Sequence, residues 1–255
     1  MPAAAVAQAP LVEMRGIHKR YGGVHALEGA DFTIYPREIH ALVGDNAAGK
    51  SSLIKALSGA APADDGQILF EGRPIAIREP RHAKALGIET VYQDLALADN
   101  LDIPANIFLG RELMCRGLLA LFMDLRRMRE EAGKLLGRLK IRIPDLHQKV
   151  RTLSGGQRQC VGIARSVYFN ARVIILDEPT AALGVEETRK VLDLVREMRD
   201  QGLSVVMISH NLAHVFDLCD RISVMKTGSV VGTRHVSETN REEILRLIVM
   251  GREAG

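Results

Sequence analysis

The sequence predicts an α/β fold in which a mainly parallel sheet is covered by helices. Short apolar runs alternate along the chain with longer segments of helical periodicity, as expected when parallel strands are joined by helices. Residues 173–176 and 204–208 are apolar without alternation, which is typical of strands buried on both faces. Between residues 94 and 170 the strand signals vanish, so we expect a helical region inserted into the α/β core.

The N-terminal half carries the first predicted elements. Ile39–Val43 is an apolar strand that runs directly into a glycine-rich segment. Lys50–Leu57 has the pattern of a helix, which should end near Gly59. Ile88–Tyr92 is a further predicted strand. This part of the chain therefore predicts a strand, a glycine-rich turn and a helix in direct succession.

The C-terminal part predicts a hairpin and a final helix. Arg221–Met225 and Ser229–Val231 flank the turn residues Lys226-Thr227-Gly228, which favours a β-hairpin. Residues 239–242, Thr-Asn-Arg-Glu, have the spacing of a capping box. We therefore expect a terminal helix that packs on the core through the apolar residues Ile244, Leu245, Leu247 and Ile248.

Within the helical region, one helix is predicted by spacing and by a cap. Asp124 is a plausible N-cap, and apolar residues then recur at helical intervals: Leu125, Met128, Ala132, Leu135, Leu136 and Leu139. The basic stretch 126–140 contains Glu130 and Glu131, which favours a solvated helix face over a binding patch. The preceding apolar run, Leu118–Met123, fits either a buried helix or a contact surface.

Composition limits the class of protein. The 255 residues are 47% hydrophobic and 25% charged, as in a soluble globular chain, and no apolar run approaches the ~20 residues that span a bilayer. A net charge of +3 is too small to argue for a nucleic-acid partner. The first ten residues lack the features of a secretory signal, so we expect a disordered tail. Cys115, Cys160 and Cys219 are far apart, which disfavours disulfides or zinc and suits a reducing cytosol.

Residues 44–51, Gly-Asp-Asn-Ala-Ala-Gly-Lys-Ser, match the phosphate-binding loop of many ATP and GTP users. Gly44 begins the tight turn, Gly49 lets the backbone approach phosphates, and Lys50 supplies a cation for the β- and γ-phosphate oxygens. The Ser51 hydroxyl is suited to ligate Mg²⁺. A turn without function is the alternative, which the strand and helix on either side disfavour. The predicted nucleotide-binding residues are Gly44, Asp45, Asn46, Ala47, Ala48, Gly49, Lys50, Ser51 and Ser52.

Two acidic residues follow the predicted strand Val173–Leu176. A carboxylate at the carboxyl end of a buried strand beside the phosphate loop can hold the Mg²⁺ shell, and we assign that role to Asp177. Glu178 then lies where a general base would polarise the attacking water. The alternative is that both residues cap the next helix, since Pro179-Thr180 follows.

Leu153-Ser154-Gly155-Gly156-Gln157 lies about a hundred residues after the phosphate loop. Ser154, Gly155 and Gly156 should open a helix that runs to Val167, with free N–H donors for a γ-phosphate. A flexible Ser-Gly-Gly turn is the weaker alternative. Together with the phosphate loop, this segment is similar to the signature of the ATP-binding cassette (ABC) family.

The resemblance to the ABC family extends from about Leu11 to Gly251. It implies a P-loop (RecA-like) ATPase core with an antiparallel β portion, over residues 11–93 and 171–255, and an inserted α-helical subdomain over 94–170. It also implies a dimer in which Ser154, Gly155, Gly156 and Gln157 of one chain close over ATP held by the other. By the same resemblance, Tyr21 stacks on adenine, Gln93 joins Ser51 and Asp177 around Mg²⁺, and His210 contacts the γ-phosphate and the base Glu178.

Two positions depart from the pattern of the family. Ala47 stands where a third loop glycine is usual, and a positive φ there would cost alanine ~1–2 kcal/mol. Gly184 replaces the usual aspartate of the D-loop, which meets its counterpart across the dimer. His210 and His214 are four residues apart, but Asn211 stands where a zinc protease needs glutamate, so we do not expect zinc.

Four further segments resemble those of ATPases of monosaccharide importers of the ribose, xylose and fructose type. They are residues 44–46, 91–97, 106–112 and 178–184. The resemblance implies two such subunits bound to a membrane permease at the cytoplasmic face, with a periplasmic sugar-binding protein as an indirect partner. Residues 94–111 would transmit closure to the permease. The alternatives are a nucleotide-gated binding subunit with low turnover and a non-transport ABC ATPase that acts on nucleic acid, which the modest charge disfavours.

Overall fold

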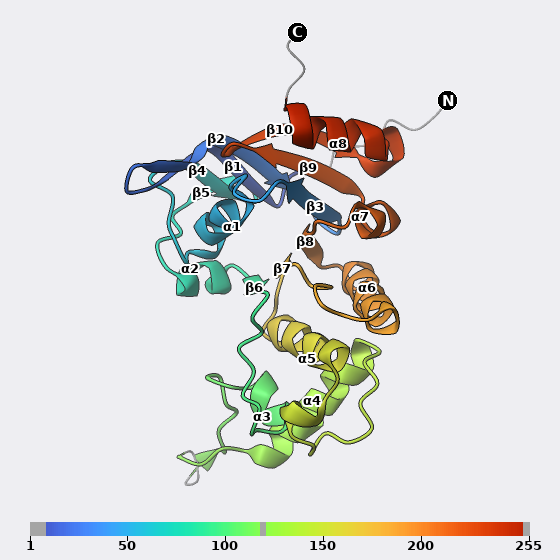
Figure 1. Cartoon of the computed structure of the whole chain (residues 1–255). Coiled ribbons are helices and arrows are strands. Elements are labelled where there is room, and N and C mark those ends of the chain that lie inside the picture. Colours follow the sequence, from blue (N-terminus) through green and yellow to red (C-terminus); the bar gives the residue numbers. More distant parts are fainter. Residues whose placement is uncertain (1–8, 118–120, 252–255) are drawn as a thin grey trace, which may run out of the picture.

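The computed structural model describes residues 9–117 and 121–251, and Figure 1 shows their arrangement. The strands are β1 (Val12–Tyr21), β2 (Val24–Ile34), β3 (Ile39–Gly44), β4 (Asp65–Phe70), β5 (Arg73–Ile75), β6 (Ile88–Val91), β7 (Val173–Asp177), β8 (Ser204–Ile208), β9 (Arg221–Lys226) and β10 (Ser229–His235). The α-helices are α1 (Lys50–Ser58), α2 (Pro80–Ala85), α3 (Ile103–Ile107), α4 (Leu125–Arg138), α5 (Gly155–Tyr168), α6 (Val185–Asp200), α7 (Leu212–Leu218) and α8 (Arg241–Met250). Two 3₁₀ helices are η2 (Val150–Thr152) and η3 (Val236–Glu238).

The larger sheet has the order β10-β9-β3-β8-β7-β6, and all neighbours except β9 and β10 are parallel. Every residue of β3 and β8 is buried, because helices and the second sheet cover both faces. The predicted strands and the predicted hairpin of β9 and β10 are confirmed. Thr227 and Gly228 form its turn with φ of 46° and 78°, the positive values that a tight hairpin favours.

The smaller sheet is antiparallel, with the order β2-β1-β4-β5. It shares a core with the larger sheet and with α1, which contributes Leu53, Ile54 and Leu57. In Figure 1 this sheet and α1 lie together at the top of the molecule, beside the larger sheet. The α/β fold with an antiparallel portion is therefore confirmed.

The helical region forms the lower part of the molecule in Figure 1, with α3, α4 and α5. In the described part of residues 94–170, β structure is limited to the isolated bridges Asp102–Lys149 and Met114–Met123. Phe108 and Val161 from this region belong to the same apolar cluster as Leu176 and Met207 of the sheet. The two parts therefore share one core, and the boundaries at 94 and 170 stay a prediction.

Two predictions in the helical region are modified. Asp124 caps α4 as predicted, since its side chain accepts a hydrogen bond from the Arg127 N–H at 2.9 Å. Leu125, however, is exposed, because it lies in the first turn before the buried stripe begins. Of the apolar run 118–123, residues 118–120 lie outside the described part. Leu121, Phe122 and Met123 are exposed, so the buried-helix interpretation is wrong for them.

The end of the chain differs by one residue from the prediction. Asn240, rather than Thr239, is the N-cap of α8, and its side chain accepts from the Glu243 N–H at 3.0 Å. Thr239 instead donates its hydroxyl to the Glu243 carboxylate at 2.7 Å. Ile244 and Leu247 pack on the core as expected, whereas Leu245 is exposed.

The two ends of the chain are described only in part. Of the predicted tail over residues 1–10, residues 1–8 lie outside the described part of the chain. Within residues 9–117 and 121–251, no helix combines the length and the apolarity needed to cross a bilayer.

Candidate nucleotide site

Four predicted site segments meet at one edge of the larger sheet. Leu42 and Asp177 both pair with Ile208 of β8, and Val91 of β6 pairs with Leu176. Because these strands are parallel, their carboxyl ends lie at the same edge. The segments that follow the strands are the phosphate loop after β3, His210 after β8, Asp177 and Glu178 at the end of β7, and Gln93 after β6.

The phosphate loop needs glycine at its two ends for different contacts. Gly44 has φ of 150°, and a Cβ there would lie 2.2 Å from the Met225 carbonyl oxygen. Gly49 has φ of 103°, and a Cβ there would lie 2.7 Å from the Ala26 carbonyl oxygen. Ala47 has φ of 65°, so the condition under which the missing glycine would be costly is met.

Lys50 begins α1 and lies across the loop. Its Nζ donates hydrogen bonds to the carbonyl oxygens of Gly44 at 2.7 Å and of Asp45 at 2.8 Å. The side chain is 7% exposed, and this burial lowers the pKa of the ammonium, while nearby Glu178 opposes the shift. The loop therefore holds a largely desolvated cation at the positive end of the α1 dipole. Ser51 and Ser52 lie in the same first turn, Ser51 exposed and Ser52 half-buried.

The two carboxylates at the end of β7 have different surroundings. Burial, followed by the negative charge of Glu178, raises the pKa of Asp177. Glu178 has φ of 49°, an uncommon value for a residue with a side chain, and its N–H donates to the Ile208 carbonyl at 3.0 Å. Its Oε1 lies 2.8 Å from His210 Nε2. The predicted base Glu178 and the predicted histidine His210 are therefore in direct contact.

Gln93 and Tyr21 lie at the periphery of this edge. Gln93 is exposed and follows by two residues the end of β6, where Val91 pairs with Leu176, the residue before Asp177. Tyr21 ends β1 at a hairpin tip, and its ring is 44% exposed with Lys19 Nζ 5.7 Å from the ring centroid. From that tip β2 leads within a few residues to Ala26, the neighbour of Gly49.

Ser154–Gln157 open α5 as predicted. The Ser154 hydroxyl accepts from the Gln157 N–H at 3.3 Å, and the Ser154 N–H donates to Gln157 Oε1 at 3.0 Å. This reciprocal pair is a capping box, which fixes the start of the helix. The alternative of a flexible Ser-Gly-Gly turn is therefore wrong, and the Gln157 side chain caps its own helix.

The glycines of this segment have a role that the sequence interpretation missed. A Cβ on Gly156 would lie 2.7 Å from Glu187 Cβ, and one on Gly155 would lie 3.1 Å from Leu183 Cδ2. Hydrogen bonding to the Ser154 side chain, and then to the Gly156 backbone, lowers the pKa of Glu187. The start of α5 is therefore packed against α6. Nothing in the sequence near either residue indicates this contact, since Glu187 three positions after Gly184 signals only the first turn of a helix, where acids are favoured.

The structure brings the sheet-edge residues together but leaves the α5 segment apart from them. In the described part of the chain, the contacts of Gly155 and Gly156 are with Leu183 and Glu187, not with the phosphate loop. Ser154 is exposed. The two predicted parts of the nucleotide site therefore lie apart within one chain.

The residues at the sheet edge suit a nucleotide with its metal ion. Two close backbone approaches at Gly44 and Gly49, a buried cation and two half-buried carboxylates match the needs of a phosphate chain. The described residues contain no cluster of three or more His, Cys, Asp or Glu side chains that could hold a metal by themselves. Mg²⁺ needs no such cluster, since it is usually bound by one or two carboxylates together with phosphates and water.

His214 has partners of its own rather than joining His210. Its Nδ1 lies 3.4 Å from Thr180 Oγ1, and its Nε2 lies 3.3 Å from Asn211 Nδ2. Cys160 and Cys219 are buried core residues, as predicted, and burial raises the pKa of the Cys160 thiol to about 11.

Comparison with known proteins decides the family. The model of the ABC transporter family matches residues 27–181, which include the phosphate loop, Ser154–Gln157 and both β7 carboxylates. The chain belongs to the ABC transporter family. The predicted family and its ATPase fold are thereby confirmed, while the role of each site residue stays a prediction.

Curated relatives of this cassette are named as sugar-import ATP-binding proteins. A xylose/arabinose import ATP-binding protein of Sulfolobus acidocaldarius is 48% identical over 238 residues, which is 93% of each chain. A fructose import ATP-binding protein of Rhizobium meliloti is 50% identical over 227 residues, covering 88% of this chain and 87% of that one. A ribose import ATP-binding protein of Escherichia coli O157:H7 is 43% identical over 240 residues, but the match covers only 46% of that protein.

Solved structures of cassettes share the fold. A nucleotide-free ATP-binding cassette from an ABC transporter superposes with a TM-score of 0.80 at 27% identity, over 94% of this chain and 95% of that one. The ADP conformation of another cassette superposes with a TM-score of 0.77 at 25% identity, with the same coverage.

Proposed function

We propose that this cassette is the ATP-hydrolysing subunit of an importer for a monosaccharide. The observation that carries hydrolysis is the 2.8 Å pair of Glu178 and His210 at the sheet edge that also holds Lys50. A subunit that only binds nucleotide has no need of a carboxylate base joined to a histidine. The monosaccharide rests on the relatives, which are named for import of xylose or arabinose, fructose and ribose.

In the proposed mechanism, the phosphate loop and Lys50 neutralise the charge of the phosphates of ATP. Ser51, Gln93 and Asp177 would hold Mg²⁺, which when bound stabilises charge on the β- and γ-phosphate oxygens. Glu178 accepts a proton from the attacking water, and His210 holds the Glu178 carboxylate in position. The raised pKa of Asp177 describes the free cassette, and a bound cation would favour its ionised form.

We also propose that the site is completed by a second chain. Within one chain, Ser154 is exposed and the start of α5 contacts Leu183 and Glu187 rather than the phosphate loop. A second copy with its α5 start over the loop would bring N–H donors and a helix dipole to the γ-phosphate. Two identical chains related by a twofold axis would then form two sites.

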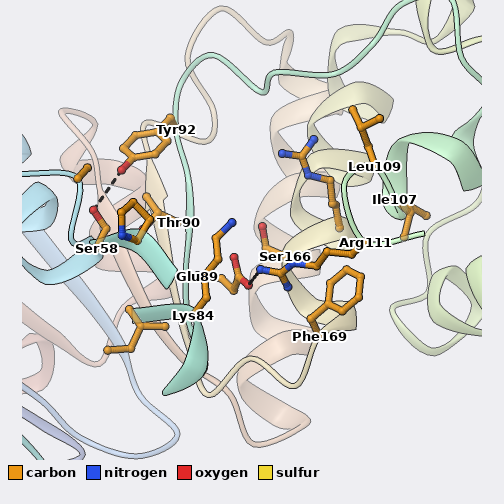
Figure 2. Close-up of a pocket in the computed structure, with 14 residues that line it drawn as sticks. Ser58, Lys84, Glu89, Thr90, Tyr92, Ile107, Leu109, Arg111, Ser166 and Phe169 are labelled. Atoms are coloured by element: carbon orange, nitrogen blue, oxygen red, sulfur yellow. Dashed lines mark hydrogen bonds and ion pairs between the residues drawn. The ribbon is translucent and has the colours of Figure 1, made fainter. Parts of the chain in front are cut away.

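For the permease, we propose the cavity of about 310 Å³ shown in Figure 2 as the docking site. Thr90 of β6 and Tyr92, which follows β6, lie on one side of it, and Ile107 and Leu109 of the helical region lie on the other. Tyr92 immediately precedes Gln93. A segment held here would therefore contact both parts of the cassette next to a predicted Mg²⁺ ligand, as a peripheral subunit on a membrane permease requires.

The cavity also has charged and polar groups that would orient a partner. Glu89 Oε1 accepts from Arg111 at 2.9 Å, and Tyr92 and Ser58 hydroxyls lie 3.1 Å apart. The Arg111 guanidinium stacks on the Phe169 ring at 4.4 Å. Arg165 is half-buried at the cavity wall, and this burial lowers its pKa. A partner segment with apolar residues and an acidic group fits this lining.

The dependence of ATP hydrolysis on protein concentration tests the composite site. The rate per chain should rise with concentration until the chains are paired, because each site needs two chains. A rate per chain that stays constant well below the dimerisation constant would show that one chain is sufficient and would overturn the proposal.

A permease pull-down tests the docking site. The Leu109→Glu variant should lose most of its retention by the membrane permease, while its ATP-dependent pairing is unchanged. Leu245→Glu is the matched control, since Leu245 is a similarly exposed leucine on α8. Equal retention of both variants would exclude the cavity as the docking site.

One observation favours a second candidate, a nucleotide-gated subunit with low turnover. The φ of 65° at Ala47 places strain in the loop that must hold the phosphates. The turnover of the chain in the presence of its permease separates the two candidates. A stable ATP-bound pair without measurable phosphate release would favour the second.

A further inference from the structure

One carboxylate is shared by the starts of two helices. Glu187 lies in the first turn of α6, three residues after the N-cap Gly184, and it accepts a hydrogen bond from the Gly184 N–H. An acid at this position commonly reaches back to its own N-cap in this way. The same carboxylate also accepts from the Ser154 hydroxyl and from the Gly156 N–H at the start of α5. Glu187 therefore caps its own helix and holds the beginning of a second one.

The packing around the carboxylate agrees with these hydrogen bonds. A Cβ on Gly156 would lie 2.7 Å from Glu187 Cβ, and one on Gly155 would lie 3.6 Å from Glu187 Oε2, so the side chain lies directly against the first turn of α5. The Ser154 oxygen accepts from the Gln157 N–H, which leaves the hydroxyl proton for the carboxylate. The hydrogen bonds from Ser154, and then from Gly156, lower the pKa of Glu187, which is therefore anionic at neutral pH.

The donors that Glu187 occupies are those that the α5 segment has to offer a second chain. The first N–H groups of a helix have no partner within it and bind anions such as phosphate. The Ser154 hydroxyl and the Gly156 N–H belong to the segment that, in the proposed function, closes over the γ-phosphate held by another chain. A carboxylate and a phosphate are both anionic acceptors, so they compete for the same donors and repel each other at contact distance.

We propose that Glu187 is an autoinhibitory latch on the start of α5, which ATP on a second chain must displace before the two chains pair. This step rests on the proposed function of the cassette. There is room for the displacement, because Ser154, Gly156 and Glu187 line one cavity of about 860 Å³. Lys190 lines the same cavity and lies three residues further along α6, where a neighbour on the same helix face is expected. The latch is closed on α5 and, when displaced, pairs with Lys190.

A purely structural cap would behave differently from a latch. If Glu187 only holds the start of α5 in place, the loss of its charge should loosen this segment and weaken the pairing of chains. If Glu187 is a latch, the loss of its charge should still destabilise the free chain, but it should strengthen pairing because the donors are released. The sign of the effect on pairing therefore separates the two roles.

Light scattering of the Glu178→Gln chain over a range of Mg²⁺·ATP concentrations measures the latch. Addition of Glu187→Gln should lower the ATP concentration at half-maximal pairing by roughly tenfold, since a neutral amide competes less well than a carboxylate for charge-assisted hydrogen bonds. Glu186→Gln in the same background is the matched control, because it removes one negative charge from an exposed acid in the same turn of α6. Its midpoint should not move. An unchanged or higher midpoint for Glu187→Gln, or an equal shift for both variants, would overturn the latch.

Two further measurements separate the latch from the proposed function. Glu187→Gln in the otherwise unmodified chain should reach half of its maximal ATPase rate per chain at a lower protein concentration. Without nucleotide, its urea midpoint should fall, because the hydrogen bonds to the start of α5 are weakened. A fall in both stability and pairing would show a structural cap and overturn the proposal. If Glu178→Gln does not pair with ATP at all, the second chain and the latch both fail; if it pairs and Glu187→Gln changes nothing, only the latch fails.

Discussion

The sheet edge and the start of α5, the two half-sites that we propose for one chain, are built in opposite ways. At the sheet edge, Lys50 is buried under its own loop and Glu178 is joined to His210 within 2.8 Å. At the start of α5, Ser154 is exposed and the glycines pack against Glu187 and Leu183. The first half-site holds charged groups where chemistry would need them. The second presents a helix N-terminus with an exposed Ser154, which the proposed second chain would use.

The two half-sites also differ in backbone strain. At the sheet edge, Ala47 and Glu178 hold φ of 65° and 49°, each a conformation that costs a residue with a side chain of the order of 1–3 kcal/mol. The start of α5 instead uses an ordinary capping box and regular helix. Positive φ also occurs at residues outside both segments, such as Ala96 and Thr227, so the strain at Ala47 and Glu178 distinguishes the sheet edge from the start of α5 but not from the rest of the described chain.

The largest effect should come from the sheet edge. Glu178→Gln should lower ATP hydrolysis by about 10²–10⁴-fold, because it removes the proton acceptor and keeps the shape of the site. Glu186→Gln, an exposed acid in the first turn of α6, should leave the rate unchanged. Phosphate release at saturating Mg²⁺·ATP measures both. A similar small loss in the two variants would mean that Glu178 is not the base.

An intermediate effect should come from the start of α5. Gly156→Ala should destabilise the fold by about 1–3 kcal/mol, because its Cβ would lie 2.7 Å from Glu187 Cβ. Gly137→Ala is the matched helical control, where a Cβ meets no atom within 4 Å, and it should stabilise the fold by roughly 0.5–1 kcal/mol. Urea unfolding measures both. If the two substitutions had the same sign, the packing of α5 on α6 would not explain this glycine.

The smallest effect should come from the strain in the phosphate loop. Ala47→Gly should stabilise the fold by less than about 1 kcal/mol, since relief of the left-handed strain is offset by the entropy of glycine in the unfolded chain. It should also tighten ATP binding by a few-fold. Ala96→Gly, at φ of 47° outside the loop, should give a similar change in stability with unchanged ATP affinity. Calorimetric titration of both variants with ATP would show whether strain in the phosphate loop is the cause of any change in ATP affinity.

The sequence predicted the structure of segments whose conformation depends mainly on their own residues. The largely apolar strands β3, β7 and β8 and the helix N-cap at Asp124 follow from short stretches of sequence. The start of α8 was misplaced by one residue because Thr239 and Asn240 are both good caps and Glu242 and Glu243 are both acidic. Residue propensity alone cannot decide between two adjacent residues that are both good N-caps.

Features that depend on contacts between two distant segments could not be predicted from the sequence. The contact of Gly156 with Glu187 joins α5 to α6, and nothing near either residue indicates it. The positive φ of Glu178 depends on its hydrogen bond to Ile208 of β8. The exposure of Leu121–Met123 was likewise open, because an apolar run fits a core as well as a surface. Tertiary packing decides each of these cases.

The most direct test of the two half-sites is the mass of the Glu178→Gln variant by light scattering, with and without Mg²⁺·ATP. The variant should bind ATP and not hydrolyse it, which traps the pair. The account predicts a monomer of the 28.0 kDa chain without nucleotide and a doubled mass with it. A mass that stays at one chain, while calorimetry shows that ATP is bound, would contradict the claim that a second copy completes the site.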